Sequence, residues 1–119
     1  STHMLIRPFE PQQAQELVEL WRASFEHGVG IKDHHPIEEQ LAYFTEQVLP
    51  NNSVRVVVDG GELVAFMATT PESVSQLYVR IANIGQGLGG RLLALAKAES
   101  NGSLWLYTFA QNHNARRFY

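Results

Sequence analysis

The residues of this chain best placed to do chemistry form one glycine-dense run, Asn83-Ile84-Gly85-Gln86-Gly87-Leu88-Gly89-Gly90. An apolar segment, Leu77-Tyr78-Val79, precedes this run, and a segment with helical periodicity, Arg91–Lys97, follows it. When a strand, a loop and a helix follow one another in this way, the first helical turn presents backbone N–H groups without intrahelical partners to an anion. Glycines let that backbone approach phosphate oxygens without a Cβ in the way. The run therefore predicts a site for a phosphate-bearing cofactor.

Three glycines of the run, Gly85, Gly87 and Gly90, also satisfy the Gly-x-Gly-x-x-Gly fingerprint of dinucleotide-binding proteins. That fingerprint requires an acidic residue about 20 positions later, at the end of the next strand, to bind the ribose. The next predicted strand ends at Phe109-Ala110-Gln111 and carries no carboxylate there. A turn that serves only packing does not need so many spaced glycines. A nucleotide-dependent oxidoreductase is therefore the third choice of function, behind the two described below.

The elements that must position this run follow from hydrophobic periodicity and from turn residues. The first helix is predicted from Pro11 to a left-handed glycine cap within residues 27–30. Trp21 and Phe25 lie on its apolar stripe and are predicted to belong to the core. The second helix is predicted from Pro36 to Val48, and a break follows at Pro50-Asn51-Asn52. Strands are predicted at residues 5–9, 54–58, 63–69, 74–79 and 104–109, a third helix at 87–99, and the start of a helix at 112–119.

The predicted strands form a mixed sheet. Asp59-Gly60-Gly61 is a strong hairpin signal between the second and third strands, because glycines supply the positive φ values of a tight turn. Leu63–Ala68 is apolar at nearly every position, which is typical of a central strand covered on both faces. The strand, helix and strand of residues 74–109 imply a parallel pair joined by a right-handed crossover. The expected fold class is α/β, with a mixed β-sheet flanked by helices.

Composition places the chain among ordinary globular domains, with 45% hydrophobic and 18% charged residues in 119. We expect a single domain over residues 4–119, because Ser1-Thr2-His3 before Met4 is typical of a cloning scar. The formal net charge of −3 gives no reason to expect nucleic acid as a partner. The absence of cysteine excludes disulfides, thiolate metal sites and cysteine nucleophiles. It also fits a reducing cytoplasm, and no apolar run is long enough to span a membrane, so we expect a cytoplasmic protein without a membrane partner.

The segment from Gln76 to Tyr119 resembles the acyl-CoA-binding half of the GNAT N-acetyltransferase superfamily. That family has a strand of the form Leu-x-Val and a loop of the form Gln/Arg-x-x-Gly-x-Gly/Ala that opens a helix. A parallel strand and the motif Asn-x-x-Ala-x-x-Phe-Tyr follow. The corresponding pieces of this sequence, in the same order, are Leu77-Tyr78-Val79, Ile84-Gly85-Gln86-Gly87-Leu88-Gly89, Leu104-Trp105-Leu106-Tyr107 and Asn112-His113-Asn114-Ala115-Arg116-Arg117-Phe118-Tyr119.

The resemblance implies that acetyl-CoA is the cofactor and that its acetyl group passes to a primary amine of a small molecule or a protein, without a covalent enzyme intermediate. It also implies a GNAT-like sheet whose parallel strands splay apart at the acyl-CoA site. Ile84 stands where the family has Gln or Arg, so one polar side-chain contact is lost while the backbone N–H groups remain. The residues assigned to the cofactor, by the resemblance or by their charge, are Leu77, Tyr78, Val79, Ile84, Gly85, Gln86, Gly87, Leu88, Gly89, Gly90, Arg91, Asn112, Ala115 and Arg116.

Acetyl transfer requires an oxyanion donor, an acid and a base. In the family, a backbone N–H of the strand before the loop stabilises the developing oxyanion, and here this N–H lies near Val79. Tyr119 matches the tyrosine of the last motif and is predicted to protonate the leaving thiolate. The base is predicted to be Glu72, just before that strand. Further candidates for the base lie near the loop between the first two helices. No metal is predicted at this loop, because its two adjacent histidines point in different directions and no further ligand has the spacing of a metal site. These candidates are Glu26, Asp33, His34 and His35.

The sequence differs from the family pattern at its end, because relatives continue beyond the motif tyrosine with a hairpin that completes the sheet. Leu104–Phe109 is therefore predicted to form an apolar sheet edge, which a homodimer could cover. The second choice of function follows from the same difference. It is a truncated, catalytically inactive GNAT-like module that binds coenzyme A or a partner without turnover.

Overall fold

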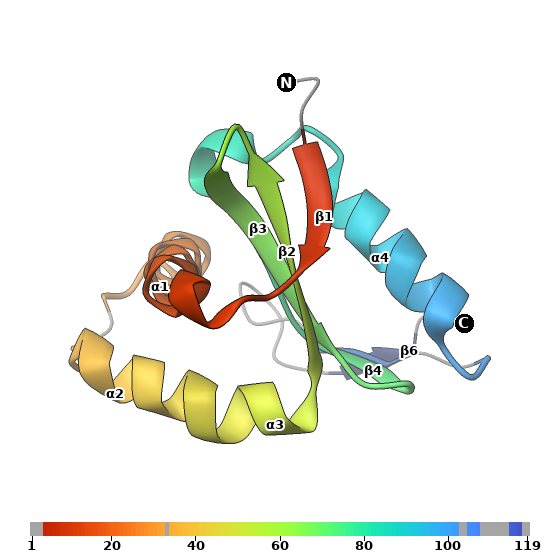
Figure 1. Ribbon diagram of the computed structural model, residues 1–119, viewed down its shortest axis with the longest axis horizontal. Helices are drawn as coiled ribbons and strands as arrows, with labels where there is room; N and C mark the ends of the chain where they lie inside the picture. The colour runs from red at the N-terminus through yellow and green to blue at the C-terminus, as the bar shows by residue number, and fades with distance from the viewer. Residues whose placement is uncertain (1–3, 33, 103–104, 108–114, 118–119) are drawn as a thin grey trace.

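The computed structural model describes residues 4–32, 34–102, 105–107 and 115–117. They include a six-stranded sheet whose strands lie in the order of the chain, β1-β2-β3-β4-β5-β6 (Figure 1). Neighbouring strands are antiparallel, except that β4 and β5 are parallel. The predicted mixed sheet and the α/β fold class are therefore confirmed. The strands are β1 Met4–Pro8, β2 Ser53–Asp59, β3 Glu62–Thr69, β4 Ser73–Val79, β5 Trp105–Tyr107 and β6 Ala115–Arg117.

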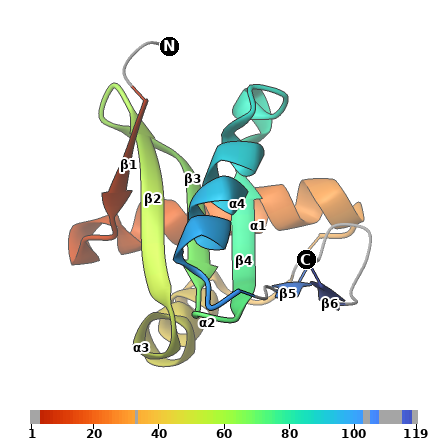
Figure 2. The ribbon, with the colours of Figure 1, turned by 90° about the vertical axis from the view of Figure 1, so that its right-hand side faces the viewer.

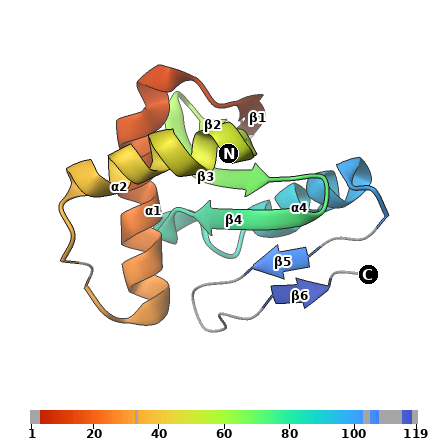
Figure 3. The ribbon, with the colours of Figure 1, turned by 90° about the horizontal axis from the view of Figure 1, so that it is seen from below.

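Helices cover the sheet on both faces (Figures 1 and 2). On one face lies α1, which begins after a short 3-10 turn, η1. A long helix made of α2, the π-helical turn η2 and α3 crosses it (Figures 1 and 3). On the other face lies α4, the crossover between β4 and β5. Among the helices that the structure describes, none has the length and apolar character needed to cross a membrane. The bounds are η1 Pro11–Gln13, α1 Ala14–Val29, α2 Ile37–Tyr43, η2 Phe44–Val48, α3 Leu49–Asn51, the 3-10 turn η3 Ile81–Asn83 and α4 Leu88–Glu99.

β3 separates two apolar cores, and every residue of this strand after Glu62 is buried. Phe66 packs with residues of α1 and η2 on one face, such as Leu17 and Phe44. Met67, its neighbour in the strand, packs with α4 residues such as Leu92 on the other face. The predicted central strand, covered on both faces, is therefore confirmed.

Two predicted glycine turns are also confirmed. Gly60 and Gly61 have φ values of 61° and 86° between β2 and β3, in which Asp59 pairs with Glu62. Gly30, with φ of 79°, caps α1 and donates its N–H to the Glu26 carbonyl at 2.8 Å. Both turns need positive φ, which only glycine adopts without strain.

The predicted break over Pro50-Asn51-Asn52 is confirmed, because helical structure ends at Asn51 and Asn52 is extended, although the helix passes through Pro50 itself. The π turn η2 directly precedes Pro50, and the Leu49 N–H donates to the Phe44 carbonyl five residues earlier. Proline has no N–H to donate, and its ring collides with an ordinary i−4 carbonyl. The wider π turn moves the preceding carbonyls and lets the helix pass through Pro50.

β4 carries one extra residue in its ladder with β3. Thr69 pairs with Val74 and Ala68 pairs with Gln76, so Ser75 is a bulge. The Ser75 hydroxyl donates to Asn52 Oδ1 at 2.8 Å, which ties the bulge to the start of β2. Parallel pairing with β5 involves Ser73 and Val74 and, in the described part of the chain, ends at the bulge (Figure 3). Because a bulge bends its strand, β4 parts from β5 at this point, and the predicted splayed pair is confirmed.

The helix predicted to begin within 112–119 is wrong where the structure describes it, since Ala115–Arg117 forms strand β6. β6 pairs antiparallel with β5, with Leu106 opposite Arg116 (Figure 3). The prediction that β5 would be an open sheet edge is therefore also wrong. The physical reason is the same for both errors, because an unpaired strand edge leaves backbone N–H and C=O groups without partners. Pairing with β6 satisfies these groups and overrides the local helical preference of the segment.

Candidate active site

The start of α4 presents backbone N–H groups that no helical bond uses. Gly87 is the N-cap with a left-handed φ of 79°, and no side chain caps the helix. The first bond across this turn runs from the Arg91 N–H to the Gly87 carbonyl at 3.1 Å. The N–H groups of Leu88, Gly89 and Gly90 lie ahead of that bond and point out of the helix end. They lie where the sequence predicts an anion site.

Open space surrounds these amides. Apart from chain neighbours and the helix's own backbone, no atom of the described residues lies within 4 Å of where a Cβ would stand at Gly85, Gly87, Gly89 or Gly90. Gly85 has a φ of 91°, so it too needs glycine for its conformation. The side chain of Leu88 is buried and holds the helix start against the core, whereas Ile84 is 58% exposed. A phosphate group could therefore approach the amides without displacing a side chain.

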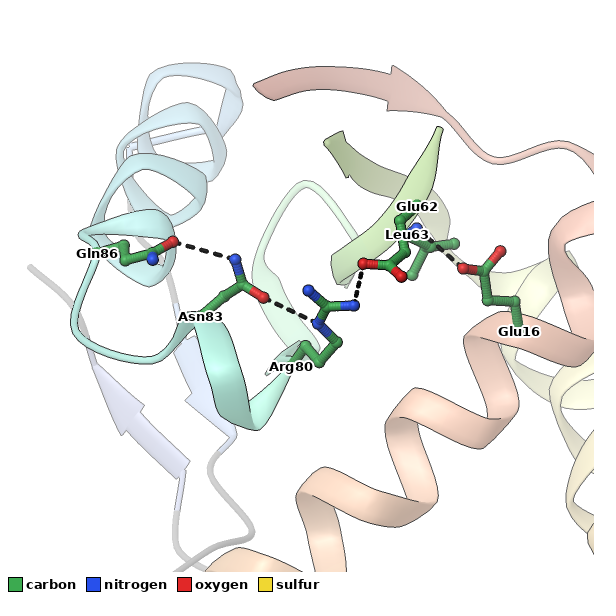
Figure 4. Close-up of polar contacts among 6 residues, drawn as sticks. All are labelled: Glu16, Glu62, Leu63, Arg80, Asn83 and Gln86. Atoms are coloured by element: carbon green, nitrogen blue, oxygen red, sulfur yellow. Dashed lines mark hydrogen bonds and ion pairs between the residues drawn. The ribbon is translucent and has the colours of Figure 1, made fainter. Parts of the chain in front are cut away.

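A chain of polar contacts fixes the loop between β4 and α4 (Figure 4). Asn83 is 6% exposed and lies at its centre. Its Oδ1 accepts from Arg80 Nε at 2.9 Å, and its Nδ2 donates to Gln86 Oε1 at 3.1 Å. Arg80 also forms an ion pair with Glu62 at the β2–β3 hairpin, and its backbone N–H donates to the Val64 carbonyl at 2.7 Å. Gln86, predicted to bind the cofactor, thus uses its amide oxygen to hold the loop.

Sequence reasoning did not identify Arg80 and Glu62 as parts of this site. Their only signal is the proximity of Arg80 to the glycine run, because Glu62 lies 18 residues earlier in the chain. The contact depends on the sheet, which places the β2–β3 hairpin beside the end of β4. Arg91, the predicted phosphate ligand, is exposed one helical turn into α4.

After the Ser75 bulge, one backbone edge of β4 faces away from β3, toward the place where β4 and β5 splay apart (the splay). Arg80 bonds to Val64 on β3, and in an antiparallel pair the next residue directs its polar groups to the opposite side. The Val79 carbonyl accordingly accepts from the Ser24 hydroxyl of α1 at 2.9 Å rather than from β3. By the same alternation, the N–H groups of Leu77 and Val79 face away from β3. These N–H groups lie beyond the last pairing of β4 with β5.

Side chains of β4 alternate between the two faces of the sheet after the bulge. Leu77 and Val79 pack against the core that contains Leu88 and α4. Tyr78, by contrast, belongs to the core under α1. Of the three β4 residues predicted to bind the cofactor, Tyr78 therefore directs its side chain to a different place from the other two.

The Tyr78 side chain lines a pocket of about 540 Å³ between α1, α2 and β4. Four aromatic rings make most of its wall, and the Trp21 ring lies 6.4 Å from Tyr78 and 6.2 Å from Tyr43, centroid to centroid. Phe66, beneath the pocket, stacks on Tyr78 at 5.7 Å. The predicted core residues Trp21 and Phe25 thus pack against the core and also line the pocket. The lining residues are Trp21, Phe25, His35, Glu39, Gln40, Tyr43, Gln76 and Tyr78.

Burial changes the chemistry of two groups in this pocket. It raises the pKa of Tyr78 to about 12, and a hydrogen bond with the Trp21 side chain opposes this rise. Tyr78 therefore stays a neutral phenol at physiological pH. Gln76 is 8% exposed, and its Oε1 is buried with no hydrogen-bond partner in the part of the chain that the structure describes. The carboxylate of the pocket belongs to Glu39, an exposed residue.

The structure does not bring every predicted residue to the pocket. Glu72 is exposed in the β3–β4 turn, where its N–H donates to Thr70 Oγ1 at 3.2 Å. It lies on the other side of the bulge from Gln76, at the opposite end of β4 from the glycine loop. His35 lines the pocket, whereas His34 and Glu26 are not part of its lining. Ala115 lies in β6 with Arg116. The predicted residues outside the described part of the chain are Asp33, Asn112 and Tyr119.

Sequence reasoning missed Gln76 and Glu39 as pocket residues. Neither belongs to a motif, and the two residues are far apart in the sequence. The sequence has no distinct signal for Gln76, because its neighbours Ser73 and Ser75 in β4 are polar too.

Comparisons with known proteins agree on one family. The family model described as the acetyltransferase (GNAT) family matches residues 14–119. A search of curated protein sequences finds no match.

Solved structures share the fold at low sequence identity. The PaiA N-acetyltransferase of Thermoplasma acidophilum, solved with coenzyme A, has a TM-score of 0.70 and 19% identity, over 92% of this chain and 81% of that one. YncA of Salmonella typhimurium, a putative acetyltransferase solved with acetyl-CoA, has a TM-score of 0.69 and 19% identity, over 92% and 72%. Apo YjaB of Escherichia coli has a TM-score of 0.69 and 21% identity, over 87% and 69%. With the family match over most of its length and this fold, the chain belongs to the GNAT acetyltransferase family.

Proposed function

We propose that this protein transfers the acetyl group of acetyl-CoA directly to the nitrogen of a primary amine. The observation that carries the proposal is the parting of β4 from β5 at the Ser75 bulge. It exposes strand amides between two sites on opposite sides of the sheet. One is the open helix start at Gly87, and the other is the aromatic pocket at Tyr78.

The residues present fit acetyl-CoA as the cofactor. The pyrophosphate would lie on the N–H groups of Leu88, Gly89 and Gly90, which suit an anion without any side chain. Arg91 would add positive charge next to it, and the lost Gln or Arg of the family at Ile84 does not affect these backbone donors. When bound, the cofactor supplies the activated acetyl thioester. Gln86 would support the cofactor loop indirectly, because its Oε1 accepts a hydrogen bond from Asn83.

The chain itself would orient the reacting groups. The Val79 N–H, directed into the splay, would donate to the thioester carbonyl oxygen. Ser24 holds the Val79 carbonyl on the same edge of the strand and so fixes the orientation of this peptide. Tyr119 remains our prediction for the acid that protonates the thiolate. Because Glu72 lies away from the pocket, we now propose that the ammonium loses its proton to Glu39 or His35, directly or through water.

We further propose that residues 4–119 act as one domain. Both cores share β3, so neither half of the sheet has a core of its own. A homodimer is no longer needed to cover β5, because β6 pairs with that strand.

Thermal unfolding with acetyl-CoA, coenzyme A and NAD tests the cofactor. A ligand at 100 times its Kd adds about 2.7 kcal/mol to stability, which shifts Tm by several degrees for a domain of this size. We expect a shift with both coenzyme A species and none with NAD. Release of free thiol in the presence of a mixture of primary amines then tests transfer. A shift without thiol release would support the inactive coenzyme A-binding module, and no shift would refute the assignment of the glycine loop.

A further inference from the structure

The amide oxygen of Gln76 is a buried acceptor without a donor in the described part of the chain, and it belongs to a residue that lines the pocket. Gln76 is more than nine-tenths buried, its Oε1 has no hydrogen-bond partner among the described residues, and the residue lines the pocket. Buried polar atoms in folded proteins almost always have a partner, and an unpaired one reduces stability. A ligand that brings an N–H to this point would therefore restore a missing hydrogen bond.

The walls of the pocket favour a cationic ligand with an apolar body. Trp21, Phe25, Tyr43 and Tyr78 present aromatic rings, which bind apolar groups on their faces and attract cations. Glu39 adds a carboxylate, and no Lys or Arg is among the described lining residues. The Arg22 guanidinium is not among the described lining residues, and its Nε donates to Oε1 of the lining residue Gln40 at 2.9 Å.

The position of Gln76 connects the pocket to the splayed strand. Gln76 and Leu77 are consecutive in β4, so the Gln76 side chain leaves the strand next to an amide that faces the splay. Successive strand residues are about 3.3 Å apart. A nitrogen held by Gln76 would therefore lie on the same strand as the Val79 N–H that we assign to the thioester carbonyl, about 10 Å along it.

We propose that Gln76 Oε1 binds the nitrogen of the acceptor, and that the acceptor is a small primary amine with an aromatic or aliphatic body and no carboxylate. This inference rests on the proposed acetyl transfer and names its acceptor class. The pocket volume is in the range of small-molecule sites, so it holds the whole body of such an amine. A carboxylate on the acceptor would meet Glu39 and no Lys or Arg among the described lining residues.

The transfer balances as follows. The ammonium loses one proton to the base, and its nitrogen forms a bond to the acetyl carbonyl carbon. The bond from that carbon to sulfur breaks, and the leaving thiolate takes a proton from the acid. A second proton then passes from the nitrogen to the deprotonated acid and restores it, so the products are a neutral amide and free coenzyme A.

Gln76→Leu removes the amide while it keeps a similar apolar volume, and Gln76→Met is a second, unbranched variant in case the first does not fold. Gln47→Leu makes the same chemical change at an exposed position of η2 and serves as the control. The probes are 2-phenylethylamine, phenylalanine, which adds a carboxylate to the same body, and a short peptide with one lysine. Acetylation kinetics are measured with each probe, and thermal unfolding is measured with 2-phenylethylamine alone.

We expect 2-phenylethylamine to be acetylated with a kcat/KM at least tenfold above that of phenylalanine or the peptide. In Gln76→Leu its KM should rise at least tenfold and its thermal shift should disappear, while the acetyl-CoA shift stays. The ligand-free variant should unfold at a higher temperature than the wild type, because an unpaired buried acceptor is gone. Gln47→Leu should change none of these values.

The two proposals fail in different ways. If acetyl-CoA does not stabilise the wild-type protein, the proposed function fails. If acetyl-CoA binds but 2-phenylethylamine is not preferred, or Gln76→Leu and Gln76→Met leave its KM unchanged, the acceptor proposal is refuted and the cofactor assignment stands.

Discussion

Gly90 offers a direct test of the anion site at the start of α4. It is the third residue of the helix, its φ lies outside the left-handed region, and nothing lies within 4 Å of an added Cβ. Replacement by Ala should stabilise the free protein by about 1 kcal/mol through helix propensity. Replacement by Glu should add about 0.3–1 kcal/mol more, because a carboxylate in the first turn interacts favourably with the helix dipole. The Tm of Gly90→Glu should therefore rise by about 4–8 °C.

The same carboxylate should weaken acetyl-CoA binding. At a separation of about 5 Å from one phosphate charge, the repulsion is about 1 kcal/mol in water and about 3 kcal/mol at an effective dielectric constant of about 20. This corresponds to an affinity about 5- to 150-fold lower. Gly90→Ala carries the helix gain without the charge, so its affinity should stay near that of the wild type.

Thermal unfolding of the three proteins, each with and without acetyl-CoA, measures both effects. At 100 times the wild-type Kd, the wild type should gain about 2.7 kcal/mol and Gly90→Glu about 0.3–1.8 kcal/mol. If Gly90→Glu is stabilised as much as the wild type, the helix start does not bind the phosphates. If Gly90→Ala loses as much affinity as Gly90→Glu, the loss is steric, and the electrostatic reasoning is refuted.

Three further predictions concern residues elsewhere in the site. The pKa of Tyr78 is about 12 in the folded protein and about 10 in the unfolded chain, so the free energy of unfolding should fall by about 2–3 kcal/mol between pH 10 and 12. Urea titrations at each pH measure this fall, which Tyr78→Phe should lack. An equal fall in both proteins would contradict the raised pKa. Asn83→Ala should cost about 1–3 kcal/mol by urea unfolding, because it leaves buried partners of the loop unpaired. Glu62→Gln, which breaks an exposed ion pair, should cost less than about 1 kcal/mol, and equal losses would show that Asn83 does not hold the loop. Tyr119→Phe should lower kcat about 10²- to 10⁴-fold with the KM for acetyl-CoA unchanged, and an unchanged kcat would exclude Tyr119 as the acid.

Elements that depend on local signals could be predicted from the sequence. The β2–β3 hairpin follows from Gly60 and Gly61, and the start of α4 from the glycine run, because each needs only its own backbone conformation. The burial of β3 follows from its unbroken apolar run. The cofactor side of the candidate site could therefore be identified without a structure.

The acceptor side could not be identified in this way, because it depends on how distant elements pack. Gln76 and Glu39 share a pocket only after α2 lies across β4. The passage of helical structure through Pro50 depends on a π turn, for which the sequence has no clear signal. β6 forms because β5 offers it an edge, and this partner is invisible to an analysis of local propensity.

The order of the strands in the sheet has a consequence for how the protein folds. Each strand lies beside its neighbour in the chain, and β2, β3 and β4 are joined by short turns within residues 53–79. Such a meander closes short loops, which costs little chain entropy, so it can form early and serve as the template for the rest. The pocket and the α4 amides are then completed later, when α1 and α4 dock on opposite faces of that template. The meander that is expected to form first thus carries the β4 part of the site, and the helices that complete both sites are added last.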